Sequence, residues 1–342
     1  MFRRKIQLPP VSIGRTLSAT EVDKRRDEFL WWHGAVGAKK AHGAGITGKG
    51  VKIGIIDTGV APHTDLDETR NVNCTKDILL DKQGHGTHVA GIIAMKKDNK
   101  GFVGIAPGVT IETFKALDNT GSGFNSDVAR AIRLAVDSGC DVINMSLGGG
   151  SDSSISRAVN YAYKKGVILV VASGNESANE VSYPAAYSFC LAVGSVDKDM
   201  RKSWFSNAGT ALDVVAPGSD ILSCSHERNG YVTMSGTSMA TPVVSGVVAL
   251  YIEWFKSKNS RKPTVAEVFA WIADTAKDLG TAGSDVDTGA GLIQCNFVDP
   301  KPGIVTKMVF EDAQEGGITS WFTWGGVALV LGYLGYVLFS LL

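Results

Sequence analysis

The sequence predicts an α/β protein with a mostly parallel sheet covered by helices. Short β-branched runs alternate along the chain with longer amphipathic stretches, and this succession is typical of such a sheet. The 342 residues are enough for a substantial core, and the 40 glycines indicate many tight turns. The strand-like runs lie at residues 51–56, 142–145, 167–172, 191–196 and 212–215.

The helix-like stretches lie between or after these runs. They span residues 127–138, 155–165, 238–254 and 264–274. In a parallel sheet, ligands bind beyond the carboxyl ends of the strands. Polar residues that directly follow a strand are therefore the first candidates for a functional site.

Charge and cysteine usage narrow the classes of function. The 34 basic residues equal the 34 acidic residues, so no excess of positive charge favours a nucleic-acid partner. Five cysteines, of which the nearest pair (Cys190 and Cys224) is 34 residues apart, form neither a disulfide scaffold nor a zinc motif. Their odd number favours a reducing compartment. No apolar run follows Arg3 and Arg4, so a cleaved export signal is not expected.

The last 25 residues, 318–342, contain no Asp, Glu, His, Lys or Arg and are predominantly apolar. About 20 apolar residues suffice to cross a bilayer, and Trp321 and Trp324 stand where interfacial aromatic anchors are found. This pattern predicts a transmembrane tail anchor, preceded by a linker at residues 299–317. Lys301 and Lys307 on its N-terminal side favour a catalytic part that faces the cytoplasm. A buried core helix is the alternative.

Asp57 and His85 are the first two candidates for chemistry. Asp57 directly follows a strand-like run, where a carboxylate can orient another group, although a turn aspartate is the alternative. His85 and His88 lie three residues apart at the start of a small-residue helix. No third metal ligand is nearby, so we interpret His85 as a general base, and His88 as a packing residue.

Ser238 and Asn175 complete the set. Ser238 opens a long apolar helix, where its own N–H and the positive end of the helix could stabilise an oxyanion. An N-cap serine is the alternative. The Gly-x-Ser-x-Gly elbow does not apply, because position 240 is Ala. Asn175 follows the strand-like run that ends at residue 172 and could donate its amide to the same oxyanion, or could simply form a turn.

Three blocks of sequence around these residues resemble the signatures of the subtilisin-like serine proteases (subtilases). They are DTG at Asp57, HGTHVAG at His85 and GTSMATP at Ser238, and the resemblance extends from about residue 45 to residue 297. It also includes residues 144–149, 183–187 and 215–223. The resemblance implies the family's three-layer fold, with Asp57 orienting His85, His85 as base and acid, Ser238 as nucleophile, and Asn175 binding the oxyanion.

The resemblance also implies a binding cleft for peptides in extended conformation. Residues of two segments would flank the substrate as neighbouring strands, namely Gly121, Ser122, Gly123, Ser146, Leu147 and Gly148. A pocket for a large side chain would have as its walls Leu147, Gly148, Gly149, Ala172, Ser173 and Gly174. Glu176 and Ser182 at the rim of this pocket would also admit a basic side chain.

A structural calcium ion is a further implication of the resemblance. Asp65 and Asp98, with backbone carbonyls of the loop at residues 95–102, offer the oxygen ligands that Ca²⁺ prefers. Three lysines in this loop (Lys96, Lys97 and Lys100) oppose a cation. The alternative is a solvated surface loop.

The first 20 residues resemble the short extension of the intracellular subtilisins. Pro9 and Pro10 lie within residues 6–11, and a proline both removes an N–H from strand pairing and misplaces the scissile bond. The resemblance therefore predicts an inhibitory extension at residues 1–20 before a catalytic domain at residues 21–298, with a disordered tail as the alternative. It also implies self-association.

Together these observations predict a membrane-tethered serine endopeptidase that faces the cytoplasm and needs no organic cofactor. One alternative is a catalytically silent, membrane-anchored protein that holds peptides in the same cleft. Another is a structural component with processing activity, in which the C-terminal segment is a packing helix within an assembly.

Overall fold

The structure is a computed structural model that describes residues 5–24, 28, 30–67, 70–97, 102–227 and 229–300. The predicted transmembrane segment, most of the predicted linker and Asp98 lie outside the described residues.

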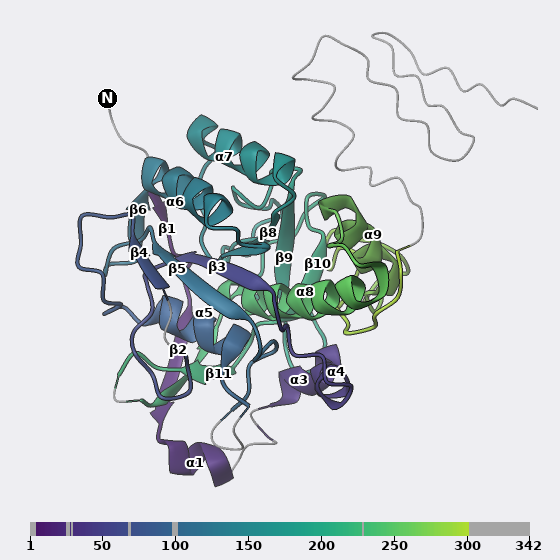
Figure 1. Cartoon of the computed structure of the whole chain (residues 1–342), viewed down its shortest axis with the longest axis horizontal. Coiled ribbons are helices and arrows are strands. Elements are labelled where there is room, and N and C mark those ends of the chain that lie inside the picture. The colour runs from purple at the N-terminus through teal and green to yellow at the C-terminus, as the bar shows by residue number, and fades with distance from the viewer. Residues whose placement is uncertain are drawn as a thin grey trace, which may run out of the picture. The chain divides into compact units, whose positions relative to one another are not determined.

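The centre of the fold is a sheet of seven parallel strands in the order β10-β9-β8-β7-β3-β5-β4 (Figure 1). The inner strands are rich in β-branched residues and almost wholly buried, because helices cover both faces of a parallel sheet. The strands are β3 (Lys52–Asp57), β4 (Arg70–Asn73), β5 (Thr110–Lys115), β7 (Val142–Met145), β8 (Ile168–Ala172), β9 (Cys190–Val196) and β10 (Val214–Pro217).

Helices form the layers on the two faces of this sheet. In Figure 1, α6 and α7 lie on one side of the sheet, and α5 and α8 on the other. Helix α9 lies beside α8 in sequence and carries a capping box formed by Thr264 and Glu267. The helices are α1 (Ala19–Lys24), α3 (Trp31–Val36), α4 (Ala38–Gly43), α5 (His85–Ala94), α6 (Asn125–Asp137), α7 (Ser153–Lys164), α8 (Thr237–Asn259) and α9 (Val265–Thr275).

This architecture confirms the predicted α/β fold with a mostly parallel sheet. The five predicted strands and four predicted helices are all present, with ends that differ by a few residues. The sequence analysis did not identify β5, whose buried residues include the charged Glu112 and Lys115. A charged residue at such a position removes the apolar pattern on which the prediction of a strand depends.

Two small antiparallel sheets involve the N-terminal residues. Strand β1 (Lys5–Gln7) pairs with β6 (Ser122–Phe124), beside which it lies in Figure 1. Strand β2 (Ser12–Leu17) adds to the edge of a hairpin formed by β11 (Ile221–Cys224) and β12 (Tyr231–Ser235). Both strands of the N-terminal segment are therefore paired with the rest of the fold.

Within the described residues, α8 is the helix that is long and apolar enough to cross a membrane. Of its most apolar 18-residue window, 89% is buried inside the protein. A helix that is apolar on all sides and surrounded by other elements is a core helix.

Candidate functional site

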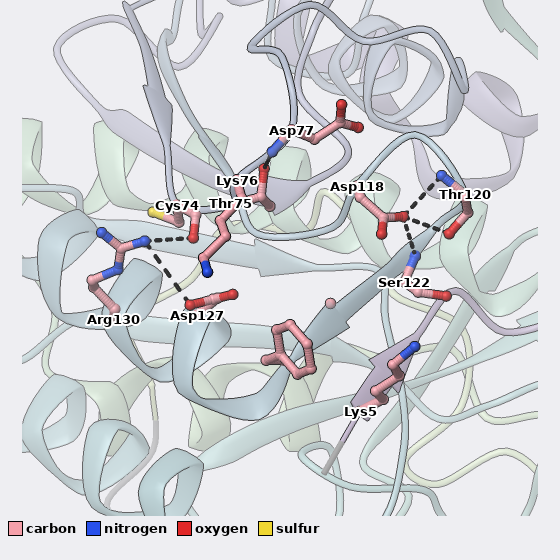
Figure 2. A pocket seen from close by; sticks show the side chains of 12 residues that line it. Lys5, Cys74, Thr75, Lys76, Asp77, Asp118, Thr120, Ser122, Asp127 and Arg130 are labelled. Carbon is pink, nitrogen blue, oxygen red and sulfur yellow. Dashed lines mark hydrogen bonds and ion pairs between the residues drawn. The ribbon is translucent and has the colours of Figure 1, made fainter. Parts of the chain in front are cut away.

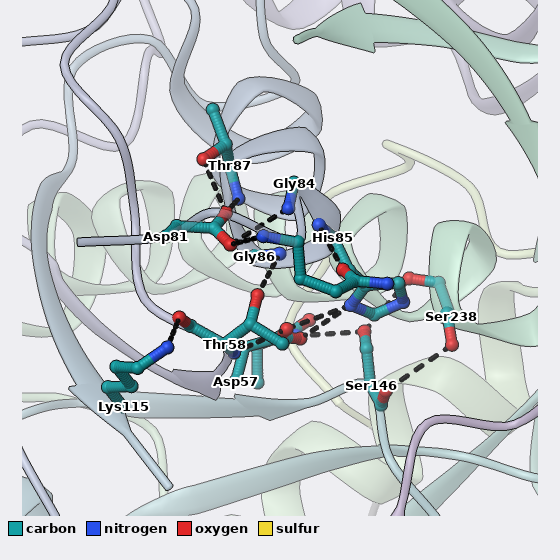
Figure 3. Close-up of polar contacts among 12 residues, drawn as sticks. Asp57, Thr58, Asp81, Gly84, His85, Gly86, Thr87, Lys115, Ser146 and Ser238 are labelled. Carbon is teal, nitrogen blue, oxygen red and sulfur yellow. Dashed lines mark hydrogen bonds and ion pairs between the residues drawn. The ribbon is translucent and has the colours of Figure 1, made fainter. Parts of the chain in front are cut away.

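Asp57 and His85 form a buried pair beyond the carboxyl end of the central sheet (Figure 3). Asp57 is the last residue of β3, and His85 is the first residue of α5. The His85 Nδ1 lies 2.8 Å from Asp57 Oδ1 and 2.9 Å from Oδ2. Because a carboxylate only accepts, Nδ1 carries the proton and Nε2 is left as the basic nitrogen of the ring. Both side chains are fully buried.

Thr58 forms hydrogen bonds both to Asp57 and to Gly86, the residue after His85. Its N–H donates to Asp57 Oδ1 at 2.7 Å, and its hydroxyl accepts from the N–H of Gly86 at 3.0 Å. Only glycine fits at position 86, since a Cβ would stand 2.1 Å from the carbonyl oxygen of Gly59. The small residues of the DTG and HGTH blocks therefore allow the turn after β3 to touch the first turn of α5.

Asp81 anchors the start of α5 from the other side. Its carboxylate accepts hydrogen bonds from the N–H groups of Gly84 (2.8 Å) and Thr87 (3.1 Å) and from the Thr87 hydroxyl (2.6 Å). A carboxylate is favoured at this end of a helix, where N–H groups lack partners. The sequence analysis missed Asp81, because an aspartate in a loop before a helix is common.

Ser238 lies in the first turn of α8, directly after the N-cap Gly236 and Thr237. Its hydroxyl donates to the carbonyl oxygen of Ser146 at 3.3 Å, as Figure 3 shows. The Ser146 hydroxyl in turn donates to the carbonyl oxygen of Ser238 at 2.8 Å. The buried His85 Nε2 has no hydrogen-bond partner among the described residues. In this arrangement the serine hydroxyl points to the neighbouring strand instead of to the basic nitrogen.

Ser146 is held by a second polar chain that the sequence analysis missed. Asn144 Nδ2 donates to the Ser146 hydroxyl at 3.1 Å, and the Ser245 hydroxyl donates to Asn144 Oδ1 at 2.9 Å. All three side chains are fully buried between β7 and α8. A buried, fully bonded chain of this kind fixes the register of the two elements.

Asn175 stands beside the start of α8 with its amide oriented by Thr237. The Asn175 Oδ1 accepts from the Thr237 N–H at 2.8 Å and from the Thr237 hydroxyl at 2.7 Å. Its Nδ2 is thereby aimed outward and donates to the carbonyl oxygen of Pro10 at 2.7 Å. The amide that was predicted to bind an oxyanion thus holds a carbonyl of the protein's own chain.

The N-terminal residues occupy the predicted substrate cleft. Gln7 exchanges two backbone hydrogen bonds with Gly148, of 3.2 and 3.1 Å, and the Leu8 N–H donates to the carbonyl oxygen of Gly121 at 2.9 Å. Ile6 is only 1% exposed. The two predicted flanking segments, residues 121–123 and 146–148, therefore lie on either side of residues 5–8 as neighbouring strands.

The walls predicted for a side-chain pocket also come together. Gly149 and Tyr183 exchange backbone hydrogen bonds, and the Ser182 N–H donates to the carbonyl oxygen of Ser173. Gly174 has a φ of +109°, and a Cβ there would stand 2.3 Å from Asn207 Nδ2. At the rim, Glu176 accepts a hydrogen bond of 2.7 Å from Asn207, which fixes its carboxylate.

A separate cavity of about 440 Å³ lies beside β6, whose three residues are part of its lining (Figure 2). Its lining includes three carboxylates, of Asp77, Asp118 and Asp127, and three cations, of Lys5, Lys76 and Arg130. Asp118 already accepts from Thr120 and Ser122, and Asp77 from the N–H groups of Asn119 and Ile78. These bonds give both carboxylates a role in local turns.

The predicted calcium site is not assembled by the described residues. Asp65 is buried, but its carboxylate accepts the Tyr231 hydroxyl. The Lys96 ammonium donates to the carbonyl oxygen of Thr64 at 3.0 Å and pairs with Asp67, so a cationic side chain already lies in this region. No group of three metal-binding side chains occurs in the part of the chain that the structure describes. Asp98 and Lys100 lie outside it.

His88 has the packing role that the sequence analysis expected. Its Nε2 lies 3.1 Å from the carbonyl oxygen of Ile221 and 3.0 Å from that of Val232, so it donates to the β11–β12 hairpin. Burial, aided by the nearby His85, lowers the pKa of His88 to about 3. His88 is therefore a neutral donor at physiological pH.

The sequence of this chain is similar to those of known proteases. The model of the subtilase family matches residues 48–291. The chain is 38% identical to subtilisin Savinase of Lederbergia lenta over 266 residues, which are 77% of this chain and 96% of that protein. It is 40% identical to subtilisin DY of Bacillus licheniformis over 253 residues (71% and 89%), and 38% identical to the M-protease of Shouchella clausii strain KSM-K16 over 276 residues (80% and 70%).

Proposed function

The chain belongs to the subtilase family and is a subtilisin-like serine endopeptidase, and we propose that Ser238, His85 and Asp57 carry out its chemistry. The hydrogen bond between His85 Nδ1 and Asp57 supports this proposal most directly, because it leaves Nε2 basic and aimed away from Asp57. His85 removes the hydroxyl proton of Ser238, which attacks the scissile carbonyl. The protonated imidazole then gives that proton to the leaving amine, and water releases the acyl group.

Asn175 and the N–H of Ser238 would bind the negative oxygen of the tetrahedral intermediate. The Asn175 amide is preorganised by its two bonds from Thr237, so little reorganisation is needed as charge develops. Its hydrogen bond to the Pro10 carbonyl supports this role, since a carbonyl oxygen already occupies the expected position.

A serine-directed fluorophosphonate tests this assignment. We expect covalent labelling of the full chain, measured by intact mass, and no labelling of Ser238→Ala. Ser257→Ala, an exposed serine near the end of α8, is the matched control and should be labelled like the wild type. Equal labelling of Ser238→Ala would contradict the proposed nucleophile. A folded chain without any labelling would favour the peptide-binding pseudo-protease.

We further propose that residues 1–20 inhibit the enzyme by occupying its cleft. In an antiparallel pair, hydrogen-bonded positions recur every two residues, so the Gln7–Gly148 pair places residue 9 opposite Ser146. A substrate residue at this position would donate its N–H to the Ser146 carbonyl. Pro9 has no N–H, and the Ser238 hydroxyl takes that carbonyl instead. The proline therefore both weakens the pairing and leaves the nucleophile turned away from His85.

The domain bounds, the membrane tether, its orientation and self-association are also proposals. We propose a catalytic domain at residues 21–298, tethered through a linker by a transmembrane helix at residues 318–342, with the catalytic part facing the cytoplasm. The length of this segment, 25 residues, and its predominantly apolar composition support the proposal. Release of the protein from membranes by alkaline carbonate would contradict the tether. Self-association like that of intracellular subtilisins is a prediction that sedimentation of the detergent-solubilised chain can test.

Calcium binding near Asp65 is also a proposal, supported by the family resemblance and by burial of this carboxylate. If an ion binds there, a chelator lowers the thermal unfolding temperature of Ser238→Ala. If the Lys96 ammonium serves in its place, the chelator has no effect. Basic side chains in the pocket next to Glu176 are the expected second substrate class, since Asn207 fixes that carboxylate at the rim.

A further inference from the structure

Lys115 is a buried cation beside the Asp57–His85 pair that the mechanism above does not use. It ends β5 and is the register partner of Asp57 on β3. Its side chain is 0% exposed. The ammonium donates to the carbonyl oxygen of Thr58 at 2.6 Å and to Asn119 Oδ1 at 3.0 Å. A lysine is rarely buried so fully unless its charge is compensated.

The contact with Thr58 connects Lys115 to both members of the pair. The Thr58 N–H donates to the Asp57 carboxylate, and its hydroxyl accepts from Gly86, the residue after His85. With Lys115 on the carbonyl, every polar group of Thr58 is bonded. Figure 3 shows Lys115 on the side of Thr58 opposite to Gly86. The ammonium thus fixes the turn from which Asp57 orients the imidazole.

Carboxylates from three segments face the Lys115 ammonium. Burial lowers the pKa of Lys115, whereas Asp81, Asp77, Asp57 and Asp118 oppose this effect and favour the charged form. Asp57 belongs to β3, Asp77 and Asp81 to the loop before α5, and Asp118 to the turn after β5. The Lys115 ammonium is linked to His85 through Thr58, to which it donates, and through Asp57, which bonds to the imidazole.

We propose that Lys115 is a positioning residue of the peptidase, whose ammonium fixes the Asp57–Thr58 turn and keeps His85 in its neutral, basic form towards lower pH. This inference rests on the proposed function. The charged and titratable groups that face His85 are Asp57, His88 on the next turn of α5, Asp81 at the helix start, Lys115, and His226, which lies against Gly84. Of these, Lys115 is the lysine, and its ammonium bonds to the turn that follows Asp57.

The test is the pH dependence of fluorophosphonate inactivation, measured with the full chain of the wild type and of Lys115→Met. Methionine keeps the length of the side chain but removes the charge. We expect the acid limb of the second-order rate constant to move upward by about half a pH unit or more, because the imidazolium is no longer opposed. Lys115→Arg, which keeps the charge, should retain the acid limb of the wild type.

Lys52→Met is the matched control. Lys52 begins β3, about 16 Å along the strand from Asp57, and pairs with Glu112. Its loss changes the net charge equally but should leave the acid limb in place. Thermal unfolding establishes that each variant is folded, and Lys115→Gln replaces Lys115→Met if the latter is not. An unmoved acid limb in a folded neutral variant, an equal shift in Lys52→Met, or loss of folding in both neutral variants would overturn the proposal. Absence of wild-type labelling at Ser238 would instead refute the proposed function.

Discussion

The side chain of Ser238, the proposed nucleophile, bonds to the main chain and not to the proposed base. Its hydroxyl bonds to the Ser146 carbonyl, while His85 Nε2 is buried without a described partner. The two groups proposed to exchange a proton are therefore not bonded to each other in this structure.

Asn175 provides the prediction at the scale of single residues. We expect Asn175→Ala to lower kcat by about 10² to 10³-fold with little change in KM, since the amide acts mainly on the charge that develops in the transition state. Steady-state kinetics with a chromogenic peptide amide provide the measurement. Asn160→Ala on α7 is the control and should retain the kcat of the wild type. An unchanged kcat in Asn175→Ala would exclude this side chain from oxyanion binding.

At the scale of elements, β1 and β2 hold one continuous segment across the active site. Strand β1 pairs with β6, the Pro10 carbonyl reaches Asn175, and β2 extends the β11–β12 hairpin. The segment is thus held on both sides of Ser238. In the inhibitory role proposed above, such a segment would compete with substrate as an intramolecular ligand, at an effective concentration far above that of a free peptide.

Replacing the proline in this segment tests its role as an inhibitor. We expect Pro9→Ala to restore the N–H that bonds to Ser146, and so to make the segment a better substrate of its own active site. Intact-mass analysis should then find N-terminal cleavage sooner than in the wild type. Pro300→Ala, outside the cleft, should behave like the wild type. Cleavage at the rate of the wild type in Pro9→Ala would show that the proline does not protect the segment.

At the scale of the whole molecule, buried histidines couple folding to pH. Burial, aided by the nearby His42, lowers the pKa of His33 to about 3, and burial lowers that of His88 to about 3. The unfolded chain titrates these groups near 6.5, so it binds more protons than the folded chain between about pH 3 and 6.5. Stability is therefore complete above about pH 6.5 and falls as the pH decreases.

We expect the free energy of unfolding to fall by about 2 kcal/mol for each of these histidines between pH 7 and 5. Urea unfolding of Ser238→Ala, which avoids self-digestion, measures this loss in a range above the titration of most carboxylates. Adding His33→Gln should reduce the dependence on pH, whereas adding His226→Gln, a partly exposed histidine, should leave it unchanged. An unaltered dependence in the His33→Gln chain would contradict the argument.

Much of the fold could be predicted from sequence because its core elements have strong local patterns. The β7 prediction matches the structure at both ends, and the helix ending at Asn259 was recognised from its apolar length. Strand β5 was missed, because the charged Glu112 and Lys115 are buried in it and are compensated by residues from other elements. Strands β1 and β2 were also missed. Each forms by pairing with a strand from a distant part of the chain, and this pairing leaves no pattern in the N-terminal sequence itself.

The sequence by itself determined the fold class and the identity of the residues proposed for catalysis. The short blocks of small residues around Asp57, His85 and Ser238 can be recognised in the sequence, because close packing requires them. A Cβ at Gly86, for example, would collide with the turn after β3. Only the tertiary structure decided what surrounds them. Three hydrogen bonds each join segments that are far apart in the chain. They link Lys115 to Thr58, Ser238 to Ser146, and Asn175 to the carbonyl oxygen of Pro10. Such contacts leave no periodic or spacing pattern, because they depend on how the sheet and helices pack.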